Sequence, residues 1–229
     1  MTDDDKRARL LEAALPNVAF DGWSKATFEA AALAAEVPLT EARRLFPRGA
    51  PDMAVALHRQ ADAAMVEAIR SADLTSMKIR ERIAFAIRAR IAAITDKEAV
   101  RRSTALFSLP LHAPEGVRLI WETSDAIWMA LGDPSRDINW YSKRATLSAV
   151  WASVVLFWLG DDSLDGQATD AFIDRRIDDV MKFEKVKAQV RENAFLRPLT
   201  GPLDRLGEMV RPPPRVPREE LPGQWTRPE

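Results

Sequence analysis

The sequence predicts an all-α protein of nine or ten helices, and three observations support this fold class. Apolar residues recur every three or four positions along most of the chain, which is the spacing of one helix face. No segment shows the sustained apolar–polar alternation of a half-buried strand. Ser, Asp and Pro residues stand where several of these periodic segments begin, as helix starts prefer. The composition, with 47% hydrophobic and 29% charged residues, is that of a soluble globular protein.

The N-terminal unit, residues 1–50, is expected to form three short helices. The first ends at Gly22, Ser24 caps the second, and Thr40 caps a third that runs to Phe46. Because a tight turn joins the second and third helices, this unit is a candidate helix-turn-helix.

Six longer helices are expected in a second unit, residues 51–193. Its most apolar part runs from Leu147 to Leu159, which is too short to cross a bilayer as a helix. We therefore expect that part to be buried on nearly all sides. The six helices are expected to cover about residues 51–72, 78–95, 97–109, 114–131, 137–159 and 169–183.

The third part of the chain, residues 194–229, is rich in proline and polar residues. It contains one short amphipathic piece between Leu203 and Val210. Such a composition predicts a disordered or extended tail.

Several classes of catalytic site are excluded by residue types. The chain has no cysteine, which removes thiolate metal sites and cysteine nucleophiles. Its two histidines, His58 and His112, belong to no Glu-x-x-His pair of the kind that di-metal sites in helix bundles use, and no phosphate-binding loop or nucleophile elbow is present. We expect a protein that is not an enzyme and that holds neither a metal nor a cofactor.

The acidic segment Asp161–Gly166 imitates the start of a calcium-binding loop. Position twelve of that loop requires a bidentate glutamate, but the chain has Phe172 there. The segment is better explained as a cap and turn between two helices.

Three arginines next to the helix-turn-helix candidate, Arg43, Arg44 and Arg48, could meet phosphates. However, no Asn, Gln or Ser lies between Thr40 and Pro47 to read base edges, and the net charge of −1 gives no overall attraction to nucleic acid. DNA is therefore an unlikely partner, although DNA binding stays open as the alternative.

Tryptophans dominate the two helices expected at residues 114–131 and 137–159. Trp121 and Trp128 stand seven positions apart in the first helix. Trp151 and Trp158 have the same spacing in the second, so each pair shares a face. Such rings either fill the core or line an apolar cavity that holds a lipid or quinone tail. The candidate lipid-binding residues are Trp121, Trp128, Leu147, Val150, Trp151, Val154 and Trp158.

Trp140 and Tyr141 form a second aromatic feature, beside Lys143 and Arg144. Adjacent helix positions point about 100° apart, so one of the two rings is expected to face outward. This composition is typical of a protein or membrane contact patch, and partial burial at a helix start explains it equally well.

With these residues identified, the chain resembles the ninth coenzyme-Q protein family, the lipid-binding accessory factors of ubiquinone biosynthesis. A looser likeness extends back through Gly22, Trp23, Phe46, Pro47 and Met65. The match rests on Gly132, Asp133, Ser135, Asp137, Asn139, Trp140, Tyr141, Arg144, Leu147, Asp162, Ser163, Asp165, Thr169, Phe172 and Arg176.

The resemblance implies a TetR-like fold with an N-terminal helix-turn-helix, a homodimer, and an isoprenoid or quinone lipid bound in the helical body. It also implies contact with the demethoxyubiquinone hydroxylase, to which the lipid is presented. The partner-binding residues carried over are Trp140 and Tyr141, with Asn139 and Asp137 positioning the turn. The alternative is a TetR-type DNA-binding regulator with an apolar ligand pocket.

The expected location follows from the same resemblance and from the N-terminus. The sequence shows no signal or transit segment, which suggests a bacterial member of the family in the cytoplasm. A peripheral place on the inner membrane is part of this expectation, because family members carry a membrane-docking C-terminal helix. The counterpart here is the short piece between Leu203 and Val210.

Overall fold

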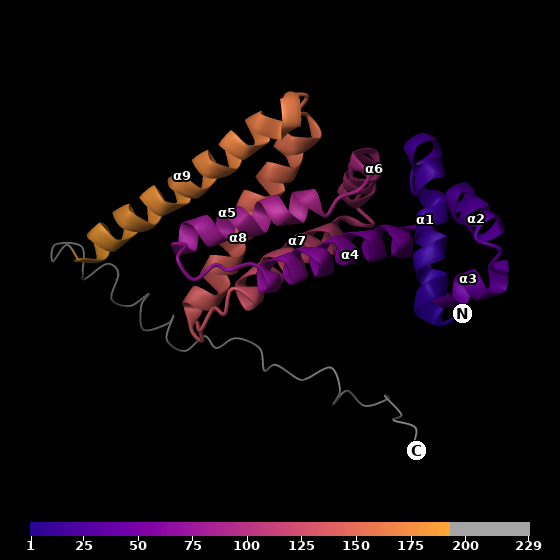
Figure 1. The fold of residues 1–229 in the computed structure, drawn as a ribbon, viewed down its shortest axis with the longest axis horizontal. Helices are drawn as coiled ribbons and strands as arrows, with labels where there is room; N and C mark the ends of the chain where they lie inside the picture. Colours follow the sequence, from indigo (N-terminus) through magenta and orange to yellow (C-terminus); the bar gives the residue numbers. More distant parts are fainter. Residues whose placement is uncertain (193–229) are drawn as a thin grey trace, which may run out of the picture.

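The computed structural model describes the backbone of residues 1–192 and the side chains of residues 1–182, and this part of the chain is helical (Figure 1). The all-α prediction is confirmed, since the described residues contain no strand. The helices are α1 (Asp3–Asp21), α2 (Lys25–Ala34), α3 (Leu39–Leu45), α4 (Ala50–Ser71), α5 (Ile79–Ala92), α6 (Lys97–Ser108), α7 (Ala113–Ala130), α8 (Ile138–Leu159), the short 3-10 helix η1 (Leu164–Gly166) and α9 (Gln167–Glu192). The predicted tail at residues 194–229 lies outside the described residues.

The helix-turn-helix forms at one end of the molecule, from α1, α2 and α3 (Figure 1). Gly22 ends α1 with a φ of +63°, a conformation that glycine adopts without strain. Ser24 caps α2 as expected, and its hydroxyl accepts the backbone N–H of Thr27. The expected cap by Thr40 is wrong. The carbonyl of Pro38 already accepts the N–H of Ala42, so α3 has begun before Thr40 and that residue lies within its first turn.

A first hydrophobic cluster joins this N-terminal unit to the rest of the chain. Its interior side chains include Leu10 from α1, Phe28 from α2, Phe46 at the C-terminal end of α3 and Met53 from α4. Ala99 of α6 is also buried in the cluster. The division of the chain at about residue 50 stays a prediction, because α4 and α6 contribute to this N-terminal core.

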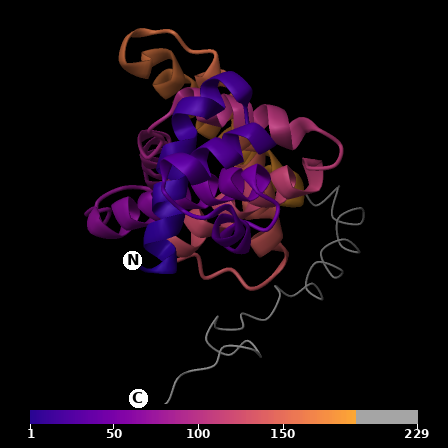
Figure 2. The ribbon, with the colours of Figure 1, turned by 90° about the vertical axis from the view of Figure 1, so that its right-hand side faces the viewer.

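A second hydrophobic cluster fills the body, where α4, α5, α7, α8 and α9 meet (Figures 1 and 2). The apolar run of α8 supplies Leu147, Trp151 and Val154 to it. The run is less enclosed than the sequence predicts, because Ala149 and Leu156 on its other face are exposed. No helix among the described residues is long and apolar enough to cross a membrane.

The acidic segment after α8 forms the turn into α9, and this turn projects from the body (Figures 1 and 2). The Asp161 carboxylate accepts hydrogen bonds from the hydroxyl and backbone N–H of Thr169 and from the backbone N–H of Ser163. These bonds, led by the one from the Thr169 side chain, hold the pKa of Asp161 well below its usual range. Phe172 stacks on Phe157 with ring centroids 4.3 Å apart. The segment is therefore a cap and turn, as predicted.

Candidate functional site

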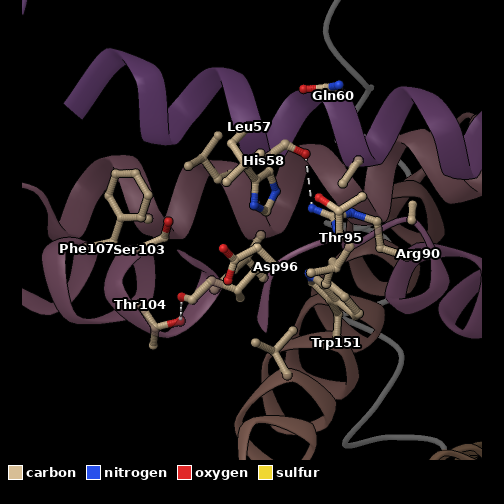
Figure 3. Close-up of a pocket in the computed structure, with 18 of the residues that line it drawn as sticks. Leu57, His58, Gln60, Arg90, Thr95, Asp96, Ser103, Thr104, Phe107 and Trp151 are labelled. Atoms are coloured by element: carbon tan, nitrogen blue, oxygen red, sulfur yellow. Dashed lines mark hydrogen bonds between the residues drawn. The ribbon is translucent and has the colours of Figure 1, made fainter. Parts of the chain in front are cut away.

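A cavity of about 930 Å³ opens in the helical body (Figure 3). Residues from α1, α4, α5, α6, α7 and α8 line it, and small side chains such as Ala61 and Ala152 leave it room. Val117 and Leu156 belong to its wall and are 69% and 63% exposed, so the cavity reaches the surface beside them. We call this space the main cavity. Its apolar wall includes Leu11, Leu15, Leu57, Val100, Phe107, Leu119, Ile120 and Val155.

One side of the main cavity carries a polar cluster made by His58, Asp62, Arg90 and Thr123. The Arg90 guanidinium donates from Nε to Asp62 Oδ1 at 2.6 Å. It also donates from Nη2 to the His58 carbonyl at 3.0 Å (Figure 3). The Thr123 hydroxyl lies 3.0 Å from Asp62 Oδ1 and 2.9 Å from His58 Nε2. Arg90 also lies over the Trp151 ring, 5.3 Å from its centroid. The cluster is thus a compensated ion pair inside an otherwise apolar site.

The His58 imidazole is uncharged at neutral pH. Burial lowers its pKa, the nearby Arg90 charge lowers it further, and the Asp62 carboxylate only partly offsets both. The resulting pKa is about 4. Neither His58 nor Arg90 was predicted as a cavity residue, because neither belongs to a recognisable sequence motif. The one sequence feature that could have indicated them is that each is a polar or charged residue on the apolar face of its helix.

A second, smaller cavity of about 420 Å³ lies at the other end of the α7–α8 pair. Three candidate lipid-binding residues, Trp128, Leu147 and Val150, line it together with Asn139. Helices α5 and α9 complete the wall with aliphatic side chains. The structure therefore brings these three candidates together, but away from the main cavity.

The four candidate tryptophans, Trp121, Trp128, Trp151 and Trp158, do not share one cavity. Trp151 lines the main cavity and Trp128 the smaller one. Trp121 packs against Trp140 instead, with ring centroids 6.0 Å apart, and Trp158 lies beneath the Lys97 ammonium. A spacing of seven keeps residues on one helix face but separates them by about 10.5 Å along the axis, which is enough to place them beside different cavities. Val154 is fully buried in the core and lines neither cavity.

The candidate partner-binding residues lie at the start of α8. Asp137 caps the helix and its carboxylate accepts the backbone and side-chain N–H groups of Asn139. Trp140 points inward and is only 7% exposed, while Tyr141 is half-buried and packs edge-on against it at 4.7 Å. Together with Trp121, these two rings form one aromatic cluster, in which Tyr141 is the outer residue of the Trp140–Tyr141 pair.

Arg144 packs against the Trp140 ring of this aromatic cluster. This role was not predicted from the sequence. Its fully buried guanidinium pairs with Asp125 of α7 and with Asp133 of the α7–α8 loop. Burial works to raise the pKa of Asp133, but hydrogen bonds from Lys143, Ser135 and Arg144 outweigh it and the pKa is lowered. A buried charge network therefore sets the position of the turn that carries Asp137 to Tyr141.

The arginines near the helix-turn-helix are engaged within the chain. Arg44 makes a bidentate pair with Asp3 at 2.9 and 2.7 Å, and Arg48 bonds both Asp52 and Glu115. Arg43 lies 3.8 Å from a Glu29 carboxylate oxygen. The charge available to phosphates on this surface is correspondingly reduced. Among the described residues, no group of three or more His, Asp or Glu side chains lies together as a metal site would need.

In a comparison with known proteins, residues 113–184 match the COQ9 family model. A ubiquinone biosynthesis protein coq9 of Dictyostelium discoideum is 42% identical over 79 residues, which are 32% of this chain and 26% of that protein. The rat protein COQ9 is 32% identical over 102 residues, 44% of this chain and 33% of its own length. The Drosophila melanogaster COQ9 is 26% identical over 191 residues, 81% of this chain and 58% of its own length. The matches thus span between about a quarter and three fifths of these relatives, all of which are named as mitochondrial.

Among solved structures, a TetR transcriptional regulator from Nitrosomonas europaea has a similar fold. It superposes with a TM-score of 0.62 at 21% identity, covering 75% of this chain and 95% of that one. The resemblance to the ninth coenzyme-Q protein family and the TetR-like fold expected from the sequence are both confirmed.

Proposed function

We propose that this protein, through its COQ9 domain and helical body, is a non-catalytic lipid-binding accessory protein of ubiquinone biosynthesis. It binds an isoprenoid or quinone lipid and presents it to the demethoxyubiquinone hydroxylase. The observation that carries the proposal is the main cavity of about 930 Å³ in a chain whose residues 113–184 match the COQ9 family model.

The size and lining of the main cavity support a lipid occupant. Ligand sites for small molecules commonly measure about 300–1,000 Å³ and are mostly apolar. Each methylene that leaves water for such a site gains about 0.8 kcal/mol. A tail of a few isoprenoid units would therefore be held by aliphatic contacts alone, and the opening beside Val117 and Leu156 gives it a way in.

The aromatic cluster at the start of α8 supports a contact with the hydroxylase. Tyr141 is the more accessible member of the Trp140–Tyr141 pair, and the exposed Asn139 and Asp137 lie directly before it. Aromatic side chains at a surface are frequent anchors of protein interfaces. In this proposal, Tyr141 meets the partner, while Trp140 and Arg144 hold the contact surface in place.

Extraction of the purified protein tests the lipid part of the proposal directly. Lipids released by organic solvent are identified by mass spectrometry, and a prenylated quinone or a related isoprenoid is expected at up to one molecule per chain. A protein that carries no lipid and binds no prenylated quinone when one is added contradicts the proposal. Light scattering tests the accompanying homodimer, and sedimentation with vesicles tests peripheral membrane binding and the proposed place on the inner membrane.

The alternative function is a TetR-type DNA-binding regulator, which the helix-turn-helix of α1 to α3 favours. The internal pairing of Arg44 and Arg48 weighs against it. A regulator would retard the DNA beside its own gene at low salt and lose that affinity steeply as salt rises. Absence of any retardation at low salt excludes this alternative.

A further inference from the structure

We infer that the His58–Asp62–Arg90 cluster is a head-group subsite of the main cavity, selective for an uncharged head that carries a hydrogen-bond-accepting oxygen, such as a quinone carbonyl. The inference rests on the proposed lipid binding and deepens it. It gives the lipid an orientation and assigns recognition to α4 and α5, outside the residues 113–184 that match the COQ9 family.

The first step is that Arg90 has a donor left over. Its Nε and Nη2 atoms are used by Asp62 and by the His58 carbonyl. Nη1 has no hydrogen-bond acceptor within the described part of the chain. Unlike the buried unpaired nitrogens of Arg102, Trp140, Arg144 and Arg176, it keeps some accessible surface. Arg90 is only 3% exposed and lines the main cavity, so we infer that this donor faces the cavity. An occupant oxygen would satisfy it.

The second step is that the guanidinium is rigidly held. The Thr123 hydroxyl, from α7, donates to the Asp62 carboxylate, and Asp62 accepts from Arg90. The Trp151 ring lies against the guanidinium at 5.3 Å (Figure 3). Three helices therefore fix one donor direction. A donor fixed before binding loses little conformational entropy when the ligand arrives, and such preorganisation favours a specific head.

The third step concerns charge. Asp62 neutralises Arg90, and the remaining charged side chains of the lining, Glu12 and Asp96, are both acidic. His58 contributes no positive charge at neutral pH, since its pKa is lowered to about 4. A phosphate or carboxylate head would therefore meet a net negative lining, whereas an uncharged carbonyl or phenol would not.

Four ligands with the same ten-carbon chain separate the possibilities when binding is measured by calorimetry on the full chain. They are a decyl-substituted benzoquinone, decylbenzene, decyl phosphate and decyltrimethylammonium. We expect the benzoquinone to bind at least about tenfold more tightly than decylbenzene. One hydrogen bond to a charged donor contributes about this factor to the affinity. Equal affinities of these two, or tightest binding of the phosphate or the ammonium, overturn the inference.

Two variants locate the effect. In the double variant Arg90→Met, Asp62→Leu, apolar residues replace the buried pair, which proteins often tolerate. In this variant the ratio of the benzoquinone affinity to the decylbenzene affinity is expected to fall from about ten to about one, while decylbenzene still binds. The single variant Arg90→Lys keeps a charge for Asp62 but lacks the guanidinium fork, so the preference is also expected to fall. Arg88→Met, on the same helix and outside the cavity lining, is the matched control and keeps it.

The outcomes distinguish this inference from the proposed function. If none of the four ligands binds the unmodified protein, lipid binding itself is wrong. If ligands bind but the double variant or Arg90→Lys retains the tenfold preference, lipid binding stands and the assignment to Arg90 is wrong.

Discussion

The guanidinium of Arg144 lies 4.0 Å from the centroid of the Trp140 ring and is fully buried. It also accounts for the inward direction of Trp140, because the ring and the cation lie one helical turn apart and stack on each other. The pairs with Asp125 and Asp133 compensate the buried charge. This one residue therefore connects α7, the α7–α8 loop and the aromatic cluster.

Replacing Arg144 by Met should destabilise the protein by about 3 kcal/mol, since it leaves the buried Asp133 carboxylate with less compensation. Urea unfolding followed by circular dichroism measures the loss. Arg118→Met, which removes an exposed arginine of α7, is the control and should change the free energy of unfolding by at most about 0.5 kcal/mol. Equal stability of the Arg144 variant and the unmodified protein would show that the network is not important for the fold.

Tyr141→Ala should weaken association with the hydroxylase while leaving most of the stability and all of the bound lipid. Trp140→Lys should instead destabilise the fold, because Trp140 is 7% exposed and a lysine there would place an unpaired charge beside Arg144. Pull-down of the hydroxylase together with thermal unfolding measures both effects. Undiminished association of Tyr141→Ala would remove Tyr141 from the proposed contact.

Three phenylalanine substitutions on α8 should show which cavity holds the lipid. Ala152→Phe fills part of the main cavity and is expected to reduce the co-purified lipid several-fold. Thr146→Phe narrows the smaller cavity, and Ala149→Phe points to solvent as a control. Both should retain the lipid, as measured by mass spectrometry of the extracts. Loss of lipid in Thr146→Phe alone would place the lipid beside Trp128, Leu147 and Val150.

Stability should fall as the pH is lowered from about 6.5 to about 4, in part because of His58. The folded-state pKa of His58 is below its unfolded value, so the unfolded chain takes up a proton first and is favoured by acid. The shift corresponds to at most about 3 kcal/mol across this range.

His58→Gln should remove this part of the pH dependence, and His112→Gln, outside the buried cluster, should keep it. Denaturant unfolding at pH 7, 5.5 and 4.5 makes the comparison. A His58 variant with the same pH dependence as the unmodified protein would contradict a buried neutral imidazole.

Local sequence patterns predicted the helices well because their causes are local. Ser24, Asp96 and Asp137 each cap the helix that follows, and each side chain bonds a backbone N–H two or three residues away. The segment that begins at Asp161 was also predicted correctly as a cap and turn. Calcium binding would need a glutamate at position twelve of the loop, where the chain has Phe172, and Asp161 instead accepts the backbone N–H of Thr169. The cap predicted at Thr40 is wrong because α3 begins earlier, with Pro38 as its N-cap.

The candidate site was predicted only in part, because periodicity gives the face of a residue and not its neighbours. Trp121 and Trp128 share a helix face, but they lie about two turns apart and meet different partners. Residues 58 and 90 are 32 positions apart, and nothing in either helix alone indicates that they meet.

By itself, the sequence determined the helical class, most helix boundaries, the absence of cysteine chemistry and the likeness to COQ9 proteins. These properties depend on residue type and on contacts within a few positions of the chain. Only the tertiary structure decided the main cavity, the buried pairing of Arg90 with Asp62 and of Arg144 with Asp133, and the burial of Trp140. Cavities and buried ion pairs arise where helices distant in sequence pack together, and their positions depend on the packing of all the helices at once.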